Sequence, residues 1–214
     1  MQRQTIIKFG AVLGLLATWS QAEAAIEFAY SSSPQSWVGG GETVSVTPAL
    51  GFSFVPYRNY GNGVSFFVND FDANPDFWAT RWWYLDFAAP YGQPLSVGSY
   101  QGATRWPFQE MGSAGLDFSG NGRGNNTLTG SFDVLEVTYA VDGEVLTFAA
   151  DFLQYDEGFQ NWWNIGSIRY NSDIPVHIAT VQEPDMLLLM GLGLGSLVML
   201  ARRRRLATSS WQHA

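Results

Sequence analysis

Two pairs of adjacent tryptophans are the residues whose type and spacing most suggest chemistry. They are Trp82-Trp83 and Trp162-Trp163. The flat apolar face of an indole packs on a sugar ring, while nearby Asp, Asn or Arg side chains bond the hydroxyls. Neighbours in a strand point to opposite faces, so both members of a pair cannot enter one core. One hypothesis is that these four residues contact sugars. The alternative is that they are core residues, or residues that pack between the core and the loops.

Carboxylates are the second kind of candidate. A glycoside hydrolase needs two Asp or Glu roughly 5–10 Å apart across a cleft, and Asp156-Glu157, beside the second tryptophan pair, is the pair to test. The alternative is an acidic, solvated turn. A Ser/His/Asp hydrolase has little support, because His177 is the only histidine before the C-terminal segment and no G-x-S-x-G motif is present. We therefore expect no catalytic residues and no enzyme.

The residue types present also limit metal chemistry. The chain has no Cys, which excludes a disulfide framework, a thiol nucleophile and Cys-ligated zinc or iron–sulfur sites. The stretch Asp117–Asn125 spaces oxygen ligands as a calcium loop does, but it lacks the third acidic ligand and the distal Glu of an EF-hand. Turns rich in Asn and Gly explain it equally well. We predict no metal and no cofactor, and leave calcium open.

The charge of the chain excludes one class of partner. Its 214 residues carry 11 Lys+Arg against 19 Asp+Glu, a formal net charge of −8. Between residues 25 and 180 there are five Arg, no Lys and 16 acidic residues, a charge of −11. Binding phosphates requires a positive stripe, so nucleic acid is not expected as a partner.

The N-terminus reads as a signal peptide. Met1–Lys8 is basic, Phe9–Trp19 is apolar, and Ala22-Glu23-Ala24 supplies the small residues that a signal peptidase requires. We predict cleavage after Ala24, with the Sec export machinery and signal peptidase as partners. The alternative is a short membrane anchor, although an apolar stretch of 11 residues is too short to span a bilayer.

The C-terminus reads as a membrane segment. Met186–Ala201 is uncharged for 16 residues and as a helix would reach about 24 Å, somewhat less than the hydrocarbon core. The following cluster of Arg202, Arg203, Arg204 and Arg205 would keep that end cytoplasmic. The alternative is a buried core helix. We predict a transmembrane helix over 186–201, a basic cytoplasmic tail over 202–214, and a middle region outside the cytoplasm.

These terminal features resemble a known sorting signal. Gln182-Glu183-Pro184, the apolar segment and the Arg cluster resemble the PEP-CTERM signal, in which a Pro-Glu-Pro motif precedes a helix and a basic end; Gln182 stands where the first Pro would be. The resemblance implies an exported, inner-membrane-anchored protein that an exosortase-type enzyme processes to the cell surface or extracellular matrix. It also implies exopolysaccharide as a candidate partner.

The middle of the chain is predicted to be all-β. Residues 25–174 alternate short strand patterns with Gly/Asn turns, which favours an antiparallel β-sandwich, with a jelly-roll-like form as one version; residues 175–185 would link it to the membrane segment. Arg169, in a strand pattern, is expected to pair with Asp151 or Asp133, and Arg123 to form a structural ion pair too. The predicted strands are Ile26–Tyr30, Thr43–Thr47, Gly51–Val55, Val64–Val68, Trp82–Phe87, Gly115–Phe118, Leu128–Ala140, Glu144–Phe152 and Gly166–Tyr170.

The best-defined element is a hairpin around Asp142-Gly143, a favoured two-residue type I′ turn. Its register would put one apolar face inward and would require a β-bulge near Val134–Leu135. The predicted inward pairs are Tyr139 with Leu146, Val137 with Phe148, and Leu135 with Ala150.

A second resemblance covers Leu116–Ser172, which contains Gly-Arg-Gly followed by Asn125, and an Asp-Phe-Leu-Gln strand ending at Asp156. It resembles a module of secreted bacterial β-proteins of unknown function. That module carries cysteines at these two positions, which implies a disulfide between them in relatives. The sequence as a whole therefore predicts a non-catalytic surface or matrix protein, with a carbohydrate-binding module as the alternative and a carboxylate-dependent glycoside hydrolase as a distant one.

Overall fold

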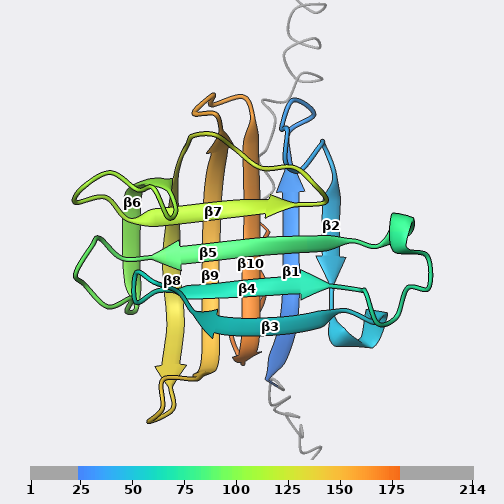
Figure 1. The fold of residues 1–214 in the computed structure, drawn as a ribbon, viewed down its shortest axis with the longest axis horizontal. Helices are drawn as coiled ribbons and strands as arrows, with labels where there is room; N and C mark the ends of the chain where they lie inside the picture. Colours follow the sequence, from blue (N-terminus) through green and yellow to red (C-terminus); the bar gives the residue numbers. More distant parts are fainter. Residues whose placement is uncertain (1–23, 179–214) are drawn as a thin grey trace, which may run out of the picture. The chain divides into compact units, whose positions relative to one another are not determined.

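A computed structural model describes residues 24–178 of the chain, and this part is all-β. It contains two short 3₁₀ helices, Pro48–Leu50 and Phe77–Ala79, and no α-helix. All nine predicted strands are present, and one further strand, β6, was not predicted (Figure 1). The strands are β1 (Ala25–Ser32), β2 (Thr43–Val46), β3 (Ser53–Arg58), β4 (Val64–Asn69), β5 (Trp82–Ala88), β6 (Gly98–Arg105), β7 (Gly115–Gly120), β8 (Leu128–Tyr139), β9 (Val145–Asp156) and β10 (Trp163–Ser172).

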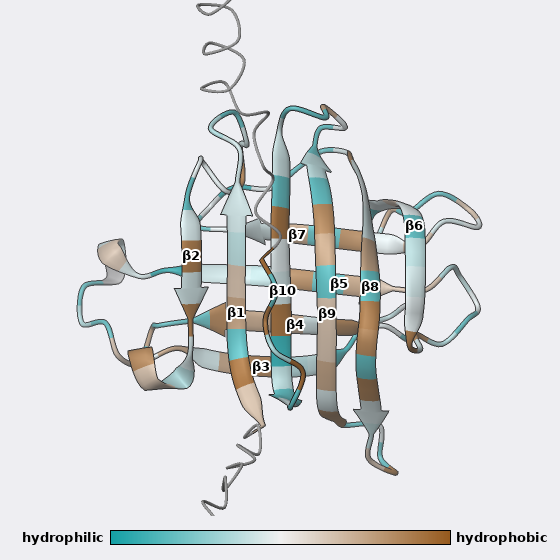
Figure 2. Ribbon diagram, turned by 180° about the vertical axis from the view of Figure 1, so that it is seen from behind, coloured by the Kyte–Doolittle hydropathy of each residue, from teal (hydrophilic) through white to brown (hydrophobic). Residues whose placement is uncertain are grey.

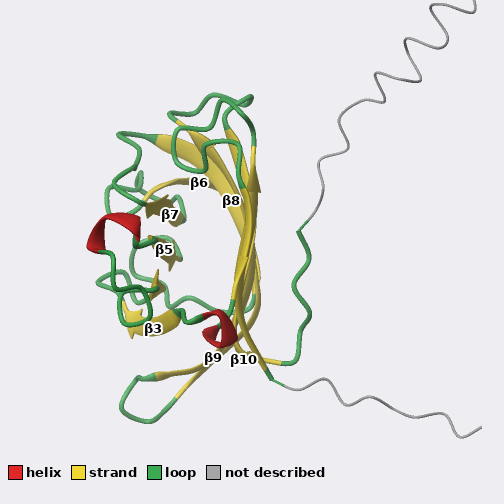
Figure 3. Ribbon diagram, turned by 90° about the vertical axis from the view of Figure 1, so that its right-hand side faces the viewer, coloured by secondary structure: helices red, strands yellow, loops and turns green. Residues whose placement is uncertain are grey.

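The ten strands form one mixed sheet in the order β2-β1-β10-β9-β8-β6-β7-β5-β4-β3. Every pairing is antiparallel except β6 with β7. Strands β7, β5, β4 and β3 run across β8, β9, β10 and β1 (Figure 1), and the sheet is curled into a half-barrel (Figure 3). The predicted sandwich of two separate sheets is not confirmed.

Strand β6 is the reason that the sheet is continuous. It pairs with β8 on one side and β7 on the other, and its register with β8 shifts between Tyr100 and Ala103. Gly102 lies in that shift with φ of +63°, a conformation that glycine adopts without strain. A bulge bends its strand and increases the local twist. The bend turns the sheet over on itself instead of ending it.

Aromatic side chains fill the space between the two halves. Strand residues alternate between the faces of a sheet, so Trp83, Leu85 and Phe87 of β5 point into the core while Tyr84 faces out. Phe28 of β1 meets Trp83 at a ring separation of 5.5 Å, and Phe148 of β9 meets Phe87 at the same separation. Such ring pairs add about 0.5–1.5 kcal/mol each to the burial of their area. The fold is therefore held by aromatic contacts between strands that do not pair.

The hairpin between β8 and β9 confirms the predicted register in its middle and corrects it at the turn. Val137 pairs with Phe148, and a bulge lies between Val134 and Glu136 as expected. The turn, however, has three residues, Val141–Gly143, with Gly143 at φ of +91°, the form that ends in a glycine bulge. A second register shift lies at Tyr139, which pairs with Val145 rather than Leu146, and Ala150 pairs with Val134 rather than Leu135. The predicted inward pairs Tyr139–Leu146 and Leu135–Ala150 are therefore wrong, and both leucines are exposed.

The back of the sheet, seen in Figure 2, shows hydrophobic and hydrophilic bands along β1, β10, β9 and β8. After β10 the chain turns back over this outer face as far as His177. The predicted linker therefore begins on the sheet. Four predicted features lie outside the described residues. They are residues 1–23 of the signal peptide, the motif Gln182-Glu183-Pro184, the helix over 186–201 and the Arg202–Arg205 cluster.

Candidate functional site

A hollow of about 670 Å³ opens at the end of the sheet where β1, β9 and the start of β8 come together. Three connections build it: the β1–β2 loop, the β7–β8 loop and the β9–β10 turn. Two tryptophans, one from the first connection and one from the last, supply its aromatic surface, and most of the other side chains are polar. The lining residues are Pro34, Gln35, Ser36, Trp37, Gly124, Asn126, Glu157 and Trp162.

Each of the two tryptophans of this hollow contacts a neighbouring side chain. Trp37 is 55% exposed; Arg123 lies 5.7 Å from its ring centroid and donates a hydrogen bond to its carbonyl oxygen at 3.4 Å. Trp162 packs against Phe159 with ring centroids 4.9 Å apart. The indoles are thus positioned before any ligand arrives, which lowers the entropic cost of binding.

A buried polar network anchors the loops of the hollow. Its centre is Asp156, which is 0% exposed. Two connections around the hollow, the β1–β2 loop and the β7–β8 loop, therefore depend on one carboxylate at the end of β9. Five groups donate to its oxygens at 2.8–3.1 Å: the Ser36 hydroxyl, the Val38 N–H, and the side-chain amides of Asn125, Gln154 and Asn164.

The network includes Asn125 and Asp156, the two positions at which the second resemblance implies a disulfide in relatives. Asn125 and Asp156 are in contact, with the Asn125 amide 3.0 Å from the carboxylate. A hydrogen bond thus joins the β7–β8 loop to the end of β9 where relatives of that module would carry cysteines.

The two residues of the predicted acidic pair, Asp156 and Glu157, lie in different environments: Asp156 is buried and Glu157 lines the hollow. Both oxygens of Asp156 are occupied by the bonds of the network. Glu157 has φ of +51°, lines the hollow, and accepts a hydrogen bond from the Asn126 N–H at 2.7 Å. In this geometry Asp156 positions the loops, and Glu157 is the carboxylate that a ligand can meet.

A second hollow, of about 400 Å³, lies on the other side of the β7–β8 loop. Trp82 and Asn121 hold each other there: the Trp82 N–H donates to the Asn121 side chain and the Asn121 N–H to the Trp82 carbonyl, both at 2.9 Å. Trp78, in the 3₁₀ helix that precedes β5, is 90% exposed. The lining residues are Phe71, Trp78, Thr80, Trp82, Asn121 and Gly122.

The alternation of strand side chains separates Trp82 from Trp83 in β5, whereas Trp162 lies in the β9–β10 turn and Trp163 begins β10. Trp82 and Trp162 each line a hollow. Trp83 is 1% exposed in the core, so the prediction of sugar contact there is wrong. Trp163 pairs with Tyr155 of β9 and lines neither hollow.

Two lining tryptophans were not singled out from the sequence. Trp37 precedes the turn Gly39-Gly40-Gly41 and Trp78 follows the turn Asn74-Pro75-Asp76. A tryptophan next to a turn signal and outside any strand pattern is the sequence feature that could have identified them, because a loop seldom buries so large a side chain.

The oxygen-bearing side chains of Asp117–Asn125 do not converge. Asp117 lies on β7 opposite Asp86 of β5, Asn121 bonds Trp82, and Asn125 bonds Asp156. Within residues 24–178 no three Asp, Glu or His side chains are grouped as metal ligands. Burial raises the pKa of Asp117 to about 6, against the opposing effect of Arg105.

Asp86, beside Asp117, has a similar environment. Burial raises its pKa to about 7; the Ser65 hydroxyl, which donates a hydrogen bond to it, opposes the shift, and the charge of Asp117 adds to it.

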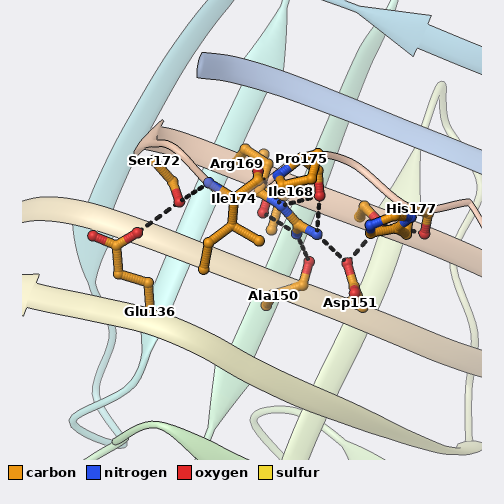
Figure 4. Close-up of polar contacts among 10 residues, drawn as sticks. Glu136, Ala150, Asp151, Ile168, Arg169, Ser172, Ile174, Pro175 and His177 are labelled. Carbon is orange, nitrogen blue, oxygen red and sulfur yellow. Dashed lines mark hydrogen bonds and ion pairs between the residues drawn. The ribbon is translucent and has the colours of Figure 1, made fainter. Parts of the chain in front are cut away.

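The pairing of Arg169 with Asp151 is confirmed, at 2.8 Å. Arg169 is 0% exposed and also donates to the carbonyl oxygens of Ile174 and Pro175, so it holds the returning chain against β10 (Figure 4). The Ser167 hydroxyl donates to the His177 carbonyl in the same way. Arg123 does not form the predicted ion pair; within the described part of the chain the ion pairs are Arg169–Asp151 and Arg81–Glu42.

No family model, no curated protein and no solved structure matches this chain. Both resemblances drawn from the sequence therefore remain predictions. Among residues 24–178, no helix has the length and apolar character needed to cross a membrane.

Proposed function

We propose that residues 24–178 form a non-catalytic carbohydrate-binding domain. The observation that carries the proposal is the hollow in which two positioned indoles, Trp37 and Trp162, stand beside Ser36, Asn126 and Glu157. Indole faces pack against the C–H faces of sugar rings, and the polar side chains are placed to bond hydroxyls. Aromatic residues at an exposed, concave and preorganised site are poorly explained by fold stability, since they lie outside the aromatic core.

The setting of this domain is proposed from the sequence. A signal peptide and a C-terminal membrane segment would place it outside the cytoplasm, tethered to the inner membrane. The PEP-CTERM resemblance then supplies an exosortase-type processing enzyme and a surface or matrix location, where exopolysaccharide is the available carbohydrate. A reporter that is active only in the periplasm, fused after Ala214, should stay silent. Activity of that reporter would contradict the proposed orientation.

A glycan-binding screen of the purified full-length chain tests the binding proposal. We expect soluble polysaccharides that bind to change the tryptophan fluorescence, and calorimetry to give their affinity. Replacing Trp37 or Trp162 by alanine should cost about 2 kcal/mol, or roughly thirtyfold in Kd, as for an aromatic residue at the centre of an interface.

Trp163 is the matched control for this experiment. It is adjacent to Trp162 and of the same type, but lies outside the hollow. Trp163→Ala should keep the affinity. An absence of binding across the panel, or full affinity in Trp37→Ala and Trp162→Ala, would contradict the proposed function. Release of new reducing ends from a bound glycan would instead favour the glycoside hydrolase.

A further inference from the structure

We infer that the two hollows are parts of one binding face for an extended, uncharged polysaccharide chain, which passes from one to the other over Gly122-Arg123-Gly124. This inference rests on the proposed function and adds to it the length and charge of the ligand. It starts from the second hollow, which repeats the chemistry of the first: aromatic surfaces from Trp78 and Trp82, with Thr80 and Asn121 beside them.

The β7–β8 loop makes the two hollows neighbours. Gly122 lines the second hollow and Gly124 lines the first. Because consecutive Cα atoms are 3.8 Å apart, these two residues are separated by at most about 7.6 Å. The two hollows therefore share the β7–β8 loop as a common wall.

The loop between the hollows is held in place on both sides. The backbone groups of Gly120 and Arg123 bond each other at 2.8 and 2.9 Å. On one side Asn121 is bonded to Trp82, and on the other Asn125 is bonded to Asp156. A rigid ridge of this kind keeps both aromatic surfaces at a constant spacing, which is what a repeating polymer requires if it is to fill both sites.

Two of the three ridge residues are glycines, and the side chain of the third, Arg123, contacts Trp37. Gly122 has φ of +78°, and no atom lies within 4 Å of the place where a Cβ would stand. Gly124 is not in the left-handed region, and the nearest atom to its hypothetical Cβ is Ser119 Cβ at 3.6 Å, an ordinary contact. Neither backbone strain nor packing thus requires glycine at position 124. A ligand that passes close to the backbone there does explain it.

The charge of the domain selects an uncharged polymer. Residues 25–180 carry a formal charge of −11, and Glu157 adds a carboxylate inside the first hollow. Arg123 is the cation on the ridge, and it is engaged with Trp37. A polyanionic glycan would be repelled by the field of the domain, so neutral sugars are favoured.

The experiment measures the affinity of the full-length chain for ladders of neutral oligosaccharides. The probes are the disaccharide through octasaccharide members of the β-1,4-glucan, β-1,3-glucan, mannan, xylan and chitin series, with alginate as the anionic probe. Affinity should rise with length by about tenfold or more and then level off once both hollows are filled. Alginate should bind more weakly than the best neutral ladder.

Two variants separate the hollows. Trp78→Ala, at a side chain that is almost wholly exposed, and Gly124→Leu, which adds bulk to the ridge, should both reduce the octasaccharide affinity to that of the shorter members. Trp78→Ala should reduce the octasaccharide affinity by a larger factor than the disaccharide affinity, whereas Trp37→Ala should weaken every member. Trp163→Ala, outside both hollows, should leave every member unchanged. Circular dichroism and urea unfolding of the variants should match the wild type.

The outcomes distinguish this inference from the proposed function. If the octasaccharide binds no better than the disaccharide, and Trp78→Ala changes neither, the second hollow is not part of the site; the inference is overturned while the proposed function stands. Tighter binding of alginate would overturn the assignment of an uncharged ligand. If no ladder and no polysaccharide binds, the proposed function fails, and this inference fails with it.

Discussion

Replacing Asp156 by alanine should unfold the loops around the first hollow and destabilise the whole domain. The carboxylate is fully buried and accepts hydrogen bonds from five donors. A buried hydrogen-bond donor that loses its acceptor lowers the free energy of unfolding by about 1–3 kcal/mol. The Ser36 hydroxyl and the Gln154 amide each keep a second acceptor, Asn164 Oδ1 and the Phe118 carbonyl oxygen, so three donors lose their acceptor. Three such donors cost about 3–9 kcal/mol, a large part of the roughly 5–15 kcal/mol by which a domain is stable.

Urea unfolding followed by tryptophan fluorescence measures the global effect, and amide hydrogen exchange measures the local one. We expect the midpoint of Asp156→Ala to fall sharply or the native baseline to be lost. Exchange should rise most at residues 36–38, where the Val38 N–H bonds the carboxylate, and around Asn125. Asp156→Asn keeps the size and an acceptor oxygen, so its loss should be intermediate.

Glu157→Gln is the control, because it changes the adjacent carboxylate, which is partly exposed and accepts a hydrogen bond from the Asn126 N–H. It should cost less than about 1 kcal/mol. The reasoning would be refuted if Asp156→Ala lost no more stability than Glu157→Gln, or if exchange at residues 36–38 stayed at the wild-type rate.

Two further predictions concern Arg169 and Asp86. Arg169→Met should release residues 173–177 from β10, because it removes the donors to Ile174 and Pro175; amide exchange and proteolysis there should increase, and the free energy of unfolding should fall by about 3 kcal/mol. Arg58→Met, at an exposed residue that lies over the Tyr139 ring, should leave exchange at 173–177 unchanged and cost no more than about 1 kcal/mol. Burial raises the pKa of Asp86 from 3.8 to about 7. Between pH 3.8 and about pH 7 the unfolded chain has lost this proton while the native state still holds it, so the free energy of unfolding falls as the pH rises through this range. The loss is complete above about pH 7. Asp86→Asn should therefore be more stable than the wild type at pH 8, by at most roughly 4 kcal/mol, and equal to it near pH 3; an equal difference at both pH values would show that Asp86 does not titrate in this way.

The strands were predictable because their signal is local. Val64–Val68 and Leu128–Ala140 carry apolar residues at a spacing of two, bounded by turn residues, and a strand forms there in both cases. An acidic partner for Arg169 could also be anticipated, because a charged residue in a strand pattern needs an opposite charge on a neighbouring strand, but only the structure chose Asp151 over Asp133. The turn at Asp142-Gly143 was predicted one residue too short, because Gly143 supplies a positive φ in either turn type.

Strand β6 was not predictable in the same way. Gly98–Arg105 contains two glycines and few apolar residues, so nothing in its own sequence favours a strand. It is one because β8 offers it a free edge and β7 a second one. Without β6 the predicted architecture is two separate sheets, whereas with β6 the strands form a single curled sheet.

The sequence by itself determined the local properties: the all-β class, the positions of nine strands, and the rule that adjacent tryptophans must face opposite ways. Only the tertiary structure decided which tryptophan of each pair is reachable, and that Trp37 and Trp78 join Trp162 and Trp82 in the two hollows. The physical reason is that a hollow is built from loops distant in sequence. Their approach depends on the curl of the sheet and on the buried bonds to Asp156, which no local pattern contains.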